Sequence, residues 1–416
     1  MVNTEYSRGG AAQMARRLHA AINARGVSSV IAYGRGGKAA DGNSYRFGLL
    51  PEVYLHAFLA RVAGIHGYGS YISTRRLENY IRKNGFDVMH LHNLHGYFLD
   101  LSFIRRLKEM KKPVVWTLHD GWPVTGRCPY LCECERWRIG CGECPDLRAY
   151  PRSWFLDASP LMHRIKMGYF CEGWSPILVL PSQWLAKGIR ESCLGGLRIE
   201  VIPNGVDTAA FSPVDRNAAR ARLGIARDRK VALLMAANLK DRRKGAGYFF
   251  EALKYINNDN LTVLLVGRKV ETGDAAGKYD IRQTGFVSGV RALADIYNAA
   301  DVFCVTYLND NFPNTVLESM SCGTPVAGFD SGGVSEQVTE GCGILVPPRD
   351  AEALGCAIDR LLRDEALRAS CGDAARKKAV GEYGMDKFAS RYIALYGELM
   401  QDRSGGPARH ESAGPH

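Results

Sequence analysis

Apolar residues recur along the first half of the chain in short runs, and stretches of helical period lie between them. Each run is bounded by turn formers, which is typical of buried strands. Because strands alternate with helices, the pattern predicts a parallel sheet covered on both faces. The loop "SRGG" at 7–10 begins so close to residue 1 that any strand before it is very short. Predicted strands are 28–34, 87–92, 113–120 and 175–182, and predicted helices include 11–25 and 99–111.

The second half repeats this plan. Between the halves, Pro203-Asn204-Gly205 is a strong turn signal and a candidate hinge. Two doubly wound α/β domains around one hinge form a cleft between the C-terminal edges of their strands, where open sheets bind ligands. Predicted strands are 231–238, 261–267, 301–307, 325–330 and 343–348.

These patterns divide the chain into a first domain at 1–203 and a second at 204–380. Helical period continues through 351–364 and 385–400. The tail at 402–416 is rich in Gly, Pro and Ser and is expected to be disordered.

Composition places the chain among soluble globular proteins. Its 416 residues suggest two domains, and 46% of them are hydrophobic while 23% are charged. No apolar run is long enough for a transmembrane helix, and the N-terminus has no signal-peptide pattern, so we expect a cytoplasmic protein. In that compartment the 12 cysteines are expected to be mostly reduced thiols or metal ligands.

The net charge of +11 lies wholly in the first half. Residues 1–203 hold 27 Lys and Arg against 16 Asp and Glu, whereas residues 204–416 hold 27 of each. A basic half can meet nucleic acid, an anionic membrane or a phosphorylated substrate, or it can be a solvated surface. No nucleic-acid-binding motif accompanies the charge, so nucleic acid is not expected as a partner.

The stretch "DNFPNTVLESMSCGTP" at 310–325 places one acid before a predicted helix and another inside it. Asn314 or Thr315 can cap this helix, whose free N–H groups favour a phosphate. Glu318 is placed to accept hydrogen bonds from a ribose, and Asp310 from a second sugar. The pair therefore suits a sugar–diphosphate–nucleoside, although both acids could also be solvated surface residues.

This stretch, with "SRGGAAQMARRL", "IPNGVD" and "RRKGAGYF", resembles the retaining glycosyltransferases of family 4. The resemblance implies the GT-B fold, in which two Rossmann-like domains face a cleft. It places the nucleotide-sugar donor mainly on the second domain and the acceptor mainly on the first. It also implies that a final helix, 381–401, crosses back to the first domain, and that catalysis needs no metal.

The resemblance assigns roles to several residues of the second domain. Glu318 looks like the ribose-binding acid, and Asp310 stands where the family has a glutamate that contacts the donor sugar. Lys244 looks like the lysine that holds the donor diphosphate. The family's upstream arginine is replaced here by Leu239, so Arg243 or Arg242 is a candidate substitute.

Further residues complete the expected site. Gly9 and Gly10 resemble the glycine loop that lets the backbone approach the diphosphate, although a Gly pair alone is usually a turn. Asn314 and Thr315 begin the helix that faces the donor. His119, at the end of a predicted strand, matches a family histidine close to the transferring sugar, so we expect it in the catalytic site with Asp310 and Glu318.

A cysteine-rich insertion at 126–146 resembles the family 4 enzymes of the colanic acid type. Three alternatives remain open for it: a structural zinc ion, buried reduced thiols, or disulfides. Cys132 has no counterpart in that pattern. The four candidate zinc ligands are Cys128, Cys134, Cys141 and Cys144.

Two further patterns lie in the first half. "HLHNLHG" holds His90, His92 and His95, for which lining of the acceptor pocket and packing are favoured over metal binding. The basic amphipathic stretch 97–112 could lie on anionic lipid, but covering its own sheet is the favoured interpretation.

We therefore predict a retaining hexosyltransferase that uses a UDP- or GDP-linked sugar. Its expected acceptor is a glycan, and one version of the hypothesis places that glycan on a lipid diphosphate carrier at the inner membrane. The expected role is in exopolysaccharide or surface polysaccharide biosynthesis. A nucleotide-sugar epimerase of the same fold, or a non-catalytic membrane-associated assembly protein, are the alternatives. No pyridoxal lysine site supports a phosphorylase.

Overall fold

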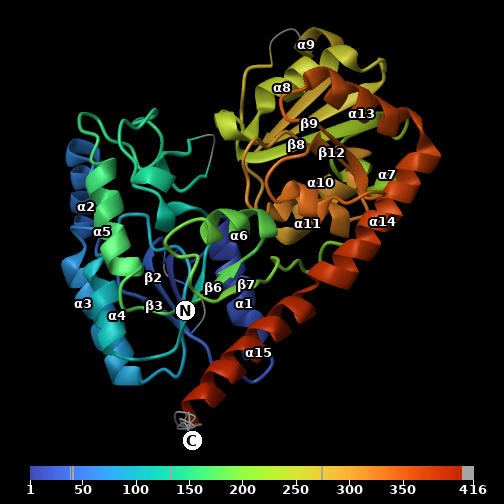
Figure 1. Ribbon diagram of the computed structural model, residues 1–416. Coiled ribbons are helices and arrows are strands. Elements are labelled where there is room, and N and C mark those ends of the chain that lie inside the picture. Colours follow the sequence, from blue (N-terminus) through green and yellow to red (C-terminus); the bar gives the residue numbers. More distant parts are fainter. Residues whose placement is uncertain (38, 40–41, 132–133, 273–274, 405–416) are drawn as a thin grey trace, which may run out of the picture.

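The computed structural model describes residues 1–37, 39, 42–131, 134–272 and 275–404. The chain forms two parallel sheets, each with helices packed on its faces (Figure 1). The first sheet ends at Val201 and the second begins at Lys230. The domain boundaries at 203 and 380 stay predictions. Residues 405–416 of the expected tail lie outside the described residues, and 402–404 continue the last helix.

The first sheet has seven parallel strands in the order β3-β2-β1-β4-β5-β6-β7. The short first strand that the sequence predicted is present, and it pairs with both β2 and β4 at the middle of the sheet. The strands are β1 (Val2–Glu5), β2 (Ile31–Arg35), β3 (Ser44–Arg46), β4 (Met89–Leu91), β5 (Val114–Thr117), β6 (Ile177–Leu180) and β7 (Ile199–Val201).

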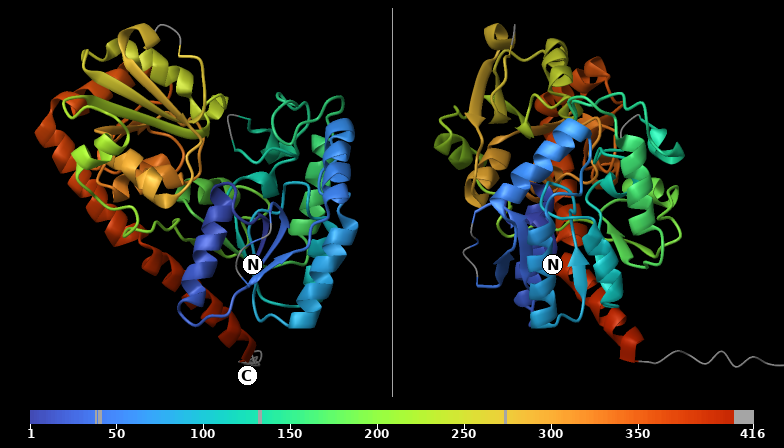
Figure 2. Two further views of the ribbon diagram at one scale, coloured as in Figure 1. Left: turned by 180° about the vertical axis from the view of Figure 1, so that it is seen from behind. Right: turned by 90° about the vertical axis from the view of Figure 1, so that its left-hand side faces the viewer.

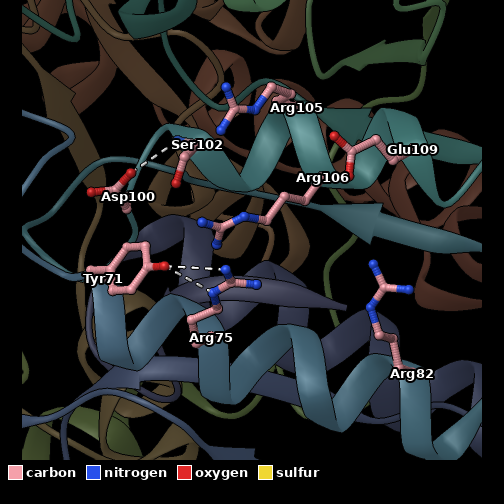
Figure 3. Close-up of a pocket in the computed structure, with 8 residues that line it drawn as sticks. All are labelled: Tyr71, Arg75, Arg82, Asp100, Ser102, Arg105, Arg106 and Glu109. Atoms are coloured by element: carbon pink, nitrogen blue, oxygen red, sulfur yellow. Dashed lines mark hydrogen bonds between the residues drawn. The ribbon is translucent and has the colours of Figure 1, made fainter.

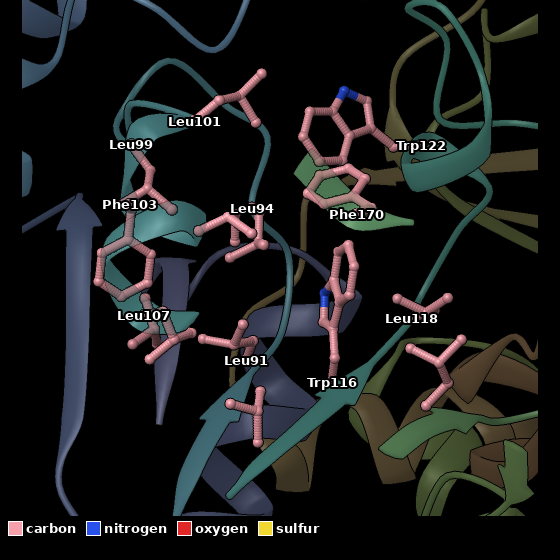
Figure 4. Close-up of a cluster of buried hydrophobic side chains, with 14 of the residues drawn as sticks. Leu91, Leu94, Leu99, Leu101, Phe103, Leu107, Trp116, Leu118, Trp122 and Phe170 are labelled. Atoms are coloured by element: carbon pink, nitrogen blue, oxygen red, sulfur yellow. The ribbon is translucent and has the colours of Figure 1, made fainter. Parts of the chain in front are cut away.

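Helices cover this sheet, and large apolar side chains fill the space between the layers. Trp116 on β5 packs edge-on against Phe170, with ring centroids 4.9 Å apart, and Trp122 joins them from the loop after the strand (Figure 4). The helices are α1 (Gly10–Asn23), α2 (Leu50–Ala63), α3 (Tyr71–Asn84), α4 (Ser102–Glu109), η1 (Trp122–Val124), η2 (Arg136–Ile139), α5 (Ser159–Phe170) and α6 (Gln183–Arg190).

The second sheet has six parallel strands in the order β10-β9-β8-β11-β12-β13. Its central strands are covered on both faces, which explains why they are continuous apolar runs in the sequence rather than alternating ones. The strands are β8 (Lys230–Asn238), β9 (Leu261–Arg268), β10 (Asp280–Gly285), β11 (Val302–Val305), β12 (Val326–Phe329) and β13 (Gly343–Val346). The helices are α7 (Arg216–Arg222), η3 (Arg242–Lys244), α8 (Ala246–Ala252), η4 (Leu253–Tyr255), α9 (Ala275–Lys278), α10 (Val290–Ala299), α11 (Asn314–Ser321), α12 (Val334–Gln337), α13 (Ala351–Arg363) and α14 (Glu365–Tyr383).

The last helix, α15 (Met385–Ser404), leaves the second domain and packs against the first (Figures 1 and 2). Its Phe388, Tyr392 and Tyr396 join a core with Leu18 of α1 and Val115 of β5. The last helix therefore contributes to the core of the first domain.

The alternation of strands and helices predicted from the sequence is confirmed. The sequence did not predict β3, β7 or β10, which are edge or near-edge strands with few large apolar residues. Within the stretch 97–112 only α4 is helical, and the side chains of Phe98, Leu101, Ile104 and Leu107 are buried in the core of the first domain. In the part of the chain that is described, no helix is long and apolar enough to cross a membrane.

Candidate active site

The two domains meet where α1 and α11 begin. Gly9 has a φ of +89°, which favours glycine, and it directly precedes α1. A Cβ on Gly10 would lie 3.7 Å from Nδ2 of Asn314, the first residue of α11. The amide of Asn204, the middle residue of the predicted hinge, donates to Asn314 Oδ1 at 3.0 Å. The glycine loop of one domain thus lies against the N-terminus of a helix in the other.

The start of α11 differs from the sequence expectation. The residue before the helix is Pro313, which makes no side-chain cap, so neither Asn314 nor Thr315 caps it. Instead the Asn314 side chain accepts from Asn204, and the Thr315 hydroxyl lies 3.1 Å from the Tyr307 hydroxyl. Cys322 and Gly323 end the helix, as predicted.

Glu318 is buried on α11 and is not a surface residue. It lies 3.0 Å from Nη2 of Arg17 on α1, and the Tyr297 hydroxyl donates to it at 3.2 Å. Burial raises the pKa of the Glu318 carboxyl, while Arg17 and Tyr297 oppose that rise. The carboxylate therefore points to the other domain, where the side chain of Arg17 covers it.

Lys244 and Asp310 form an ion pair within the second domain. The Lys244 Nζ also lies 3.9 Å from the centroid of the Tyr307 ring, whose hydroxyl contacts Thr315 on α11. Burial alone lowers the pKa of Lys244, but Asp310 and Tyr307 more than offset this, so its pKa is raised and it is charged. Lys244 and the first turn of α11 therefore both contact Tyr307.

Arg243 faces the cysteine-rich insertion. Its guanidinium carbon lies 3.3 Å from the centroid of the Tyr130 ring, and its Nη2 lies 2.6 Å from Asp241 Oδ2. Leu239, at the position of the expected arginine, is buried among apolar residues. Arg243 and Tyr130 therefore hold the insertion against the second domain.

A small cavity of about 50 Å³ lies between the domains, and its lining includes His119, Asp120, Arg243, Asp310 and Asn311. The Asn311 amide donates to the backbone carbonyl of His119 at 3.0 Å. The structure thus brings the expected His119 and Asp310 to one cavity.

His119 belongs to a chain of histidines below this cavity. Its Nε2 lies 3.0 Å from His92 Nδ1, and His90, whose ring centroid is 4.1 Å from that of His92, contacts the Tyr396 hydroxyl of α15 at 2.6 Å. Burial lowers the pKa of His119 to about 4, and it lowers the pKa values of His90 and His92 well below their ordinary range. All three rings are therefore neutral near pH 7, which suits hydrogen bonding and packing.

Two family models match the chain and together cover most of its length. Residues 8–210 match the family model described as Glycosyltransferase Family 4, and residues 215–378 match the one described as Glycosyl transferases group 1. The chain belongs to the family 4 glycosyltransferases.

Individual relatives agree with this assignment. The glycosyltransferase is 28% identical over 95% of its length to WcaC of Escherichia coli K12, which is assigned to colanic acid biosynthesis, and covers 98% of that protein. It is 31% identical to a D-inositol 3-phosphate glycosyltransferase of Kineococcus radiotolerans, over 50% of this chain and 53% of that one.

Solved structures share the fold. Sucrose-phosphate synthase from Thermosynechococcus elongatus matches with a TM-score of 0.73 at 22% identity, over 95% of this chain and 94% of that one. Anabaena HepE, solved with UDP-glucose, matches with a TM-score of 0.66 at 16% identity, over 95% and 98%. The predicted GT-B fold is thereby confirmed.

On the first-domain side, the glycosyltransferase has a carboxylate–histidine pair that the sequence did not predict. His95 Nε2 lies 2.8 Å from Asp120 Oδ2, and the other ring nitrogen of His95 lies 3.1 Å from the Tyr150 hydroxyl. Burial raises the pKa of Asp120, but His95 and the Trp122 backbone N–H outweigh this and lower it, so Asp120 is ionised. The sequence showed no carboxylate beside these histidines, because the two partners follow different strands.

The cysteine-rich insertion holds the four candidate zinc ligands. Cys128, Cys134, Cys141 and Cys144 are free and partly buried, and the Gly126 N–H donates to Cys141 Sγ at 3.0 Å. Among the described residues, no three His, Cys, Asp or Glu side chains are placed to hold a metal ion. Thiols are suitable zinc ligands, but the four thiols are not arranged around a common point as zinc ligands would be. The zinc ion therefore stays a prediction. Cys132 lies outside the described residues.

Cys171 and Cys193 form a disulfide elsewhere in the first domain. The sequence predicted mostly reduced thiols, and the other nine cysteines in the described part of the chain are free.

Proposed function

We propose that this glycosyltransferase moves a hexosyl group from a nucleotide-diphosphate sugar to a glycan hydroxyl with retention of configuration. One observation carries the proposal: the first turn of α11 lies against Gly10 of the first domain, and it shares contacts to Tyr307 with Lys244. A positive charge, two helix N-termini and a backbone without side chains are what a diphosphate needs.

The donor binds mainly through the second domain in this proposal. Its diphosphate competes with Asp310 for Lys244, and its ribose hydroxyls donate to Glu318 in place of Arg17. Asp310, once released, accepts hydrogen bonds from the donor sugar. HepE, which shares the fold, was solved with UDP-glucose, and this supports a nucleotide-sugar donor. The test compares UDP-linked with GDP-linked sugars to determine whether the donor base is uracil or guanine.

Fixed positive groups stabilise the leaving diphosphate in the proposed reaction, so the chemistry needs no metal ion. The acceptor hydroxyl attacks on the face that the diphosphate leaves, and a donor phosphate oxygen takes its proton. No side chain acts as nucleophile. Neutral His119 hydrogen-bonds the transferring sugar, and the closed interface excludes water.

We propose that the acceptor is a growing polysaccharide on a lipid diphosphate carrier at the cytoplasmic face of the inner membrane. The full-length similarity to WcaC supports a role in exopolysaccharide or surface polysaccharide biosynthesis. The charge of the first half, 27 basic against 16 acidic residues, supports an anionic lipid partner.

A screen of UDP- and GDP-linked sugars with membrane-extracted glycolipid acceptors tests the proposal. We expect Lys244→Ala and Glu318→Ala each to lower transfer by about tenfold or more, because each removes a donor contact. Lys254→Ala and Glu352→Ala, exposed on the same domain, are the matched controls and should not change it. Near-normal transfer by both site variants would contradict the proposal, and donor conversion without any acceptor would indicate an epimerase.

A further inference from the structure

Helix α2 presents its large apolar side chains to solvent. Tyr54 is 67% exposed and Phe58 is 55% exposed, with Leu50 and Leu55 similarly open, whereas the buried positions of the helix are His56, Ala57 and Ala60. A helix that covers a core turns its large apolar residues inwards. This one does the reverse, so packing within the chain does not explain its sequence.

The exposed apolar surface continues at both ends of α2. At its start, the Glu52 carboxylate accepts from the backbone N–H of Ile72 at 2.7 Å, which places exposed Tyr71 and Ile72 next to α2. At its end, the Arg61 carbonyl accepts from the N–H of Trp154 at 2.6 Å. Trp154, Phe155 and Leu156 are also exposed. We call the exposed residues of α2, Tyr71, Ile72 and 154–156 the apolar ridge.

A basic pocket of about 540 Å³ lies beside the ridge, between α3 and α4 (Figure 3). Tyr71 belongs to both surfaces. Buried Glu78 pairs with Arg106 and, at 3.3 Å, with Arg75. The rest of the lining is Arg82, Asp100, Ser102, Arg105 and Glu109.

Several polar groups that line this pocket have no ion-pair or hydrogen-bond partner among the described residues. Arg82 and Arg105 form no ion pair with any described residue, and Ser102 Oγ is buried without a hydrogen-bond partner in the described chain. Asp100 accepts from the Ser102 backbone N–H, which leaves that hydroxyl free. Two free guanidinium groups and a hydroxyl can bind the phosphate of a lipid headgroup.

We propose that the apolar ridge and the arginine pocket together dock the protein on an anionic phospholipid bilayer. Aromatic and aliphatic side chains flanked by arginines are the composition of surfaces that insert into the headgroup region. Residues 44–112 carry 11 basic and 5 acidic residues, which complements an anionic leaflet. The inference deepens the proposed function, because it rests on a lipid-linked acceptor.

A series of contacts leads from the ridge to the acceptor side of the site. The Arg61 guanidinium lies 6.0 Å from the centroid of the Tyr97 ring, whose centroid is 5.8 Å from that of Tyr150. Tyr150 contacts His95, the partner of Asp120. A bilayer on the ridge would therefore place a lipid-linked glycan near the first-domain side of the active site.

Flotation of the full-length protein with vesicles tests the inference. We expect binding to phosphatidylcholine vesicles that contain about 30 mol% phosphatidylglycerol, and weak binding to phosphatidylcholine alone. Leu55→Ser/Phe58→Ser removes ridge area, and Arg82→Glu/Arg105→Glu reverses the pocket charge. Each should lower the bound fraction by about fivefold or more. Phe286→Ser/Arg227→Glu, exposed on the second domain, is the matched control and should bind like the wild type.

Two parallel readouts separate this inference from the proposed function. Circular dichroism shows that each variant is folded, and thermal stabilisation by UDP or GDP reports donor binding, which all three variants should keep. Stabilisation by a nucleotide without vesicle binding by the wild type would overturn the lipid inference alone. Vesicle binding without nucleotide binding would overturn the proposed function alone.

A second copy of the chain is the competing occupant of the ridge. Light scattering measures the oligomeric state directly, and we expect the protein to be a monomer when no vesicles are present. A dimer that Leu55→Ser/Phe58→Ser dissociates would overturn the bilayer assignment. So would ridge and pocket variants that bind vesicles as well as the wild type does.

Discussion

Arg17 of the first domain and buried Glu318 of the second form an ion pair, with Nη2 and Oε1 3.0 Å apart. The acid expected to bind a ribose is thus held by a cation from the opposite domain. Arg17 Nη1 is also buried and has no hydrogen-bond partner in the described chain. One contact therefore joins the domain interface to the proposed donor site.

Removing the cation should destabilise the protein. Arg17→Met leaves the Glu318 carboxylate buried without its partner, and we expect a loss of about 3 kcal/mol in the free energy of unfolding. In the double variant with Glu318→Gln the losses should not add, because both changes affect one interaction. Urea unfolding measures each value. Arg25→Met, whose partner Asp386 is exposed, is the control and should cost under about 1 kcal/mol. Strict additivity would show that the pair does not couple the domains.

The buried histidines predict a loss of stability in acid. The pKa of His119 is about 4 in the folded protein, against an ordinary 6.5, because of burial. As the pH falls through that interval the unfolded chain binds a proton that the folded protein does not, so stability falls, for His119 by at most about 3 kcal/mol. The melting temperature measured from pH 7 to pH 4 should drop less in His119→Asn. Equal pH slopes for the two proteins would contradict the assignment.

The Asp120–His95 pair should serve the acceptor and not the donor. Asp120→Asn preserves shape but removes the charge that can hold an acceptor hydroxyl. We expect transfer to fall by about tenfold or more while UDP or GDP binding is unchanged. The exposed Asp87→Asn provides the control. Weakened nucleotide binding by Asp120→Asn would instead place this carboxylate on the donor side.

Metal analysis decides among the alternatives for the cysteine-rich insertion. The spacing predicts about one zinc ion per chain in protein purified without chelator, since four thiolates suit a tetrahedral site. Cys134→Ser should lower that content, and Cys356→Ser, an exposed thiol on α13, should not. Less than about half a zinc per chain in the wild type would contradict the zinc site and leave reduced thiols or disulfides as the alternatives.

Much of the fold could be predicted from the sequence, because buried parallel strands are continuous apolar runs. Strands such as β8 and β9 carry that signal, whereas β10, with the sequence DIRQTG, does not. The outward face of α2 could not be predicted, since periodicity shows that a helix has an apolar side but not which side faces solvent.

The candidate site was predicted only in part. Glu318, Lys244 and the glycine loop carry family motifs, but the partner of Glu318 is Arg17, 301 positions away, and its place in the first motif does not indicate the pairing. The pairing of Asp310 with Lys244 likewise depends on how η3 meets the loop after β11. Contacts between distant segments are set by packing and are not visible as spacing.

Isothermal titration of UDP and GDP into the wild type, Lys244→Ala and Glu318→Ala tests the central claim most directly, since it measures donor binding without needing an acceptor. We expect one nucleotide to bind the wild type, and each variant to bind it about tenfold or more weakly, with melting temperatures showing that all three are folded. Folded variants that bind the nucleotide as tightly as the wild type would contradict a donor site built on Lys244 and Glu318.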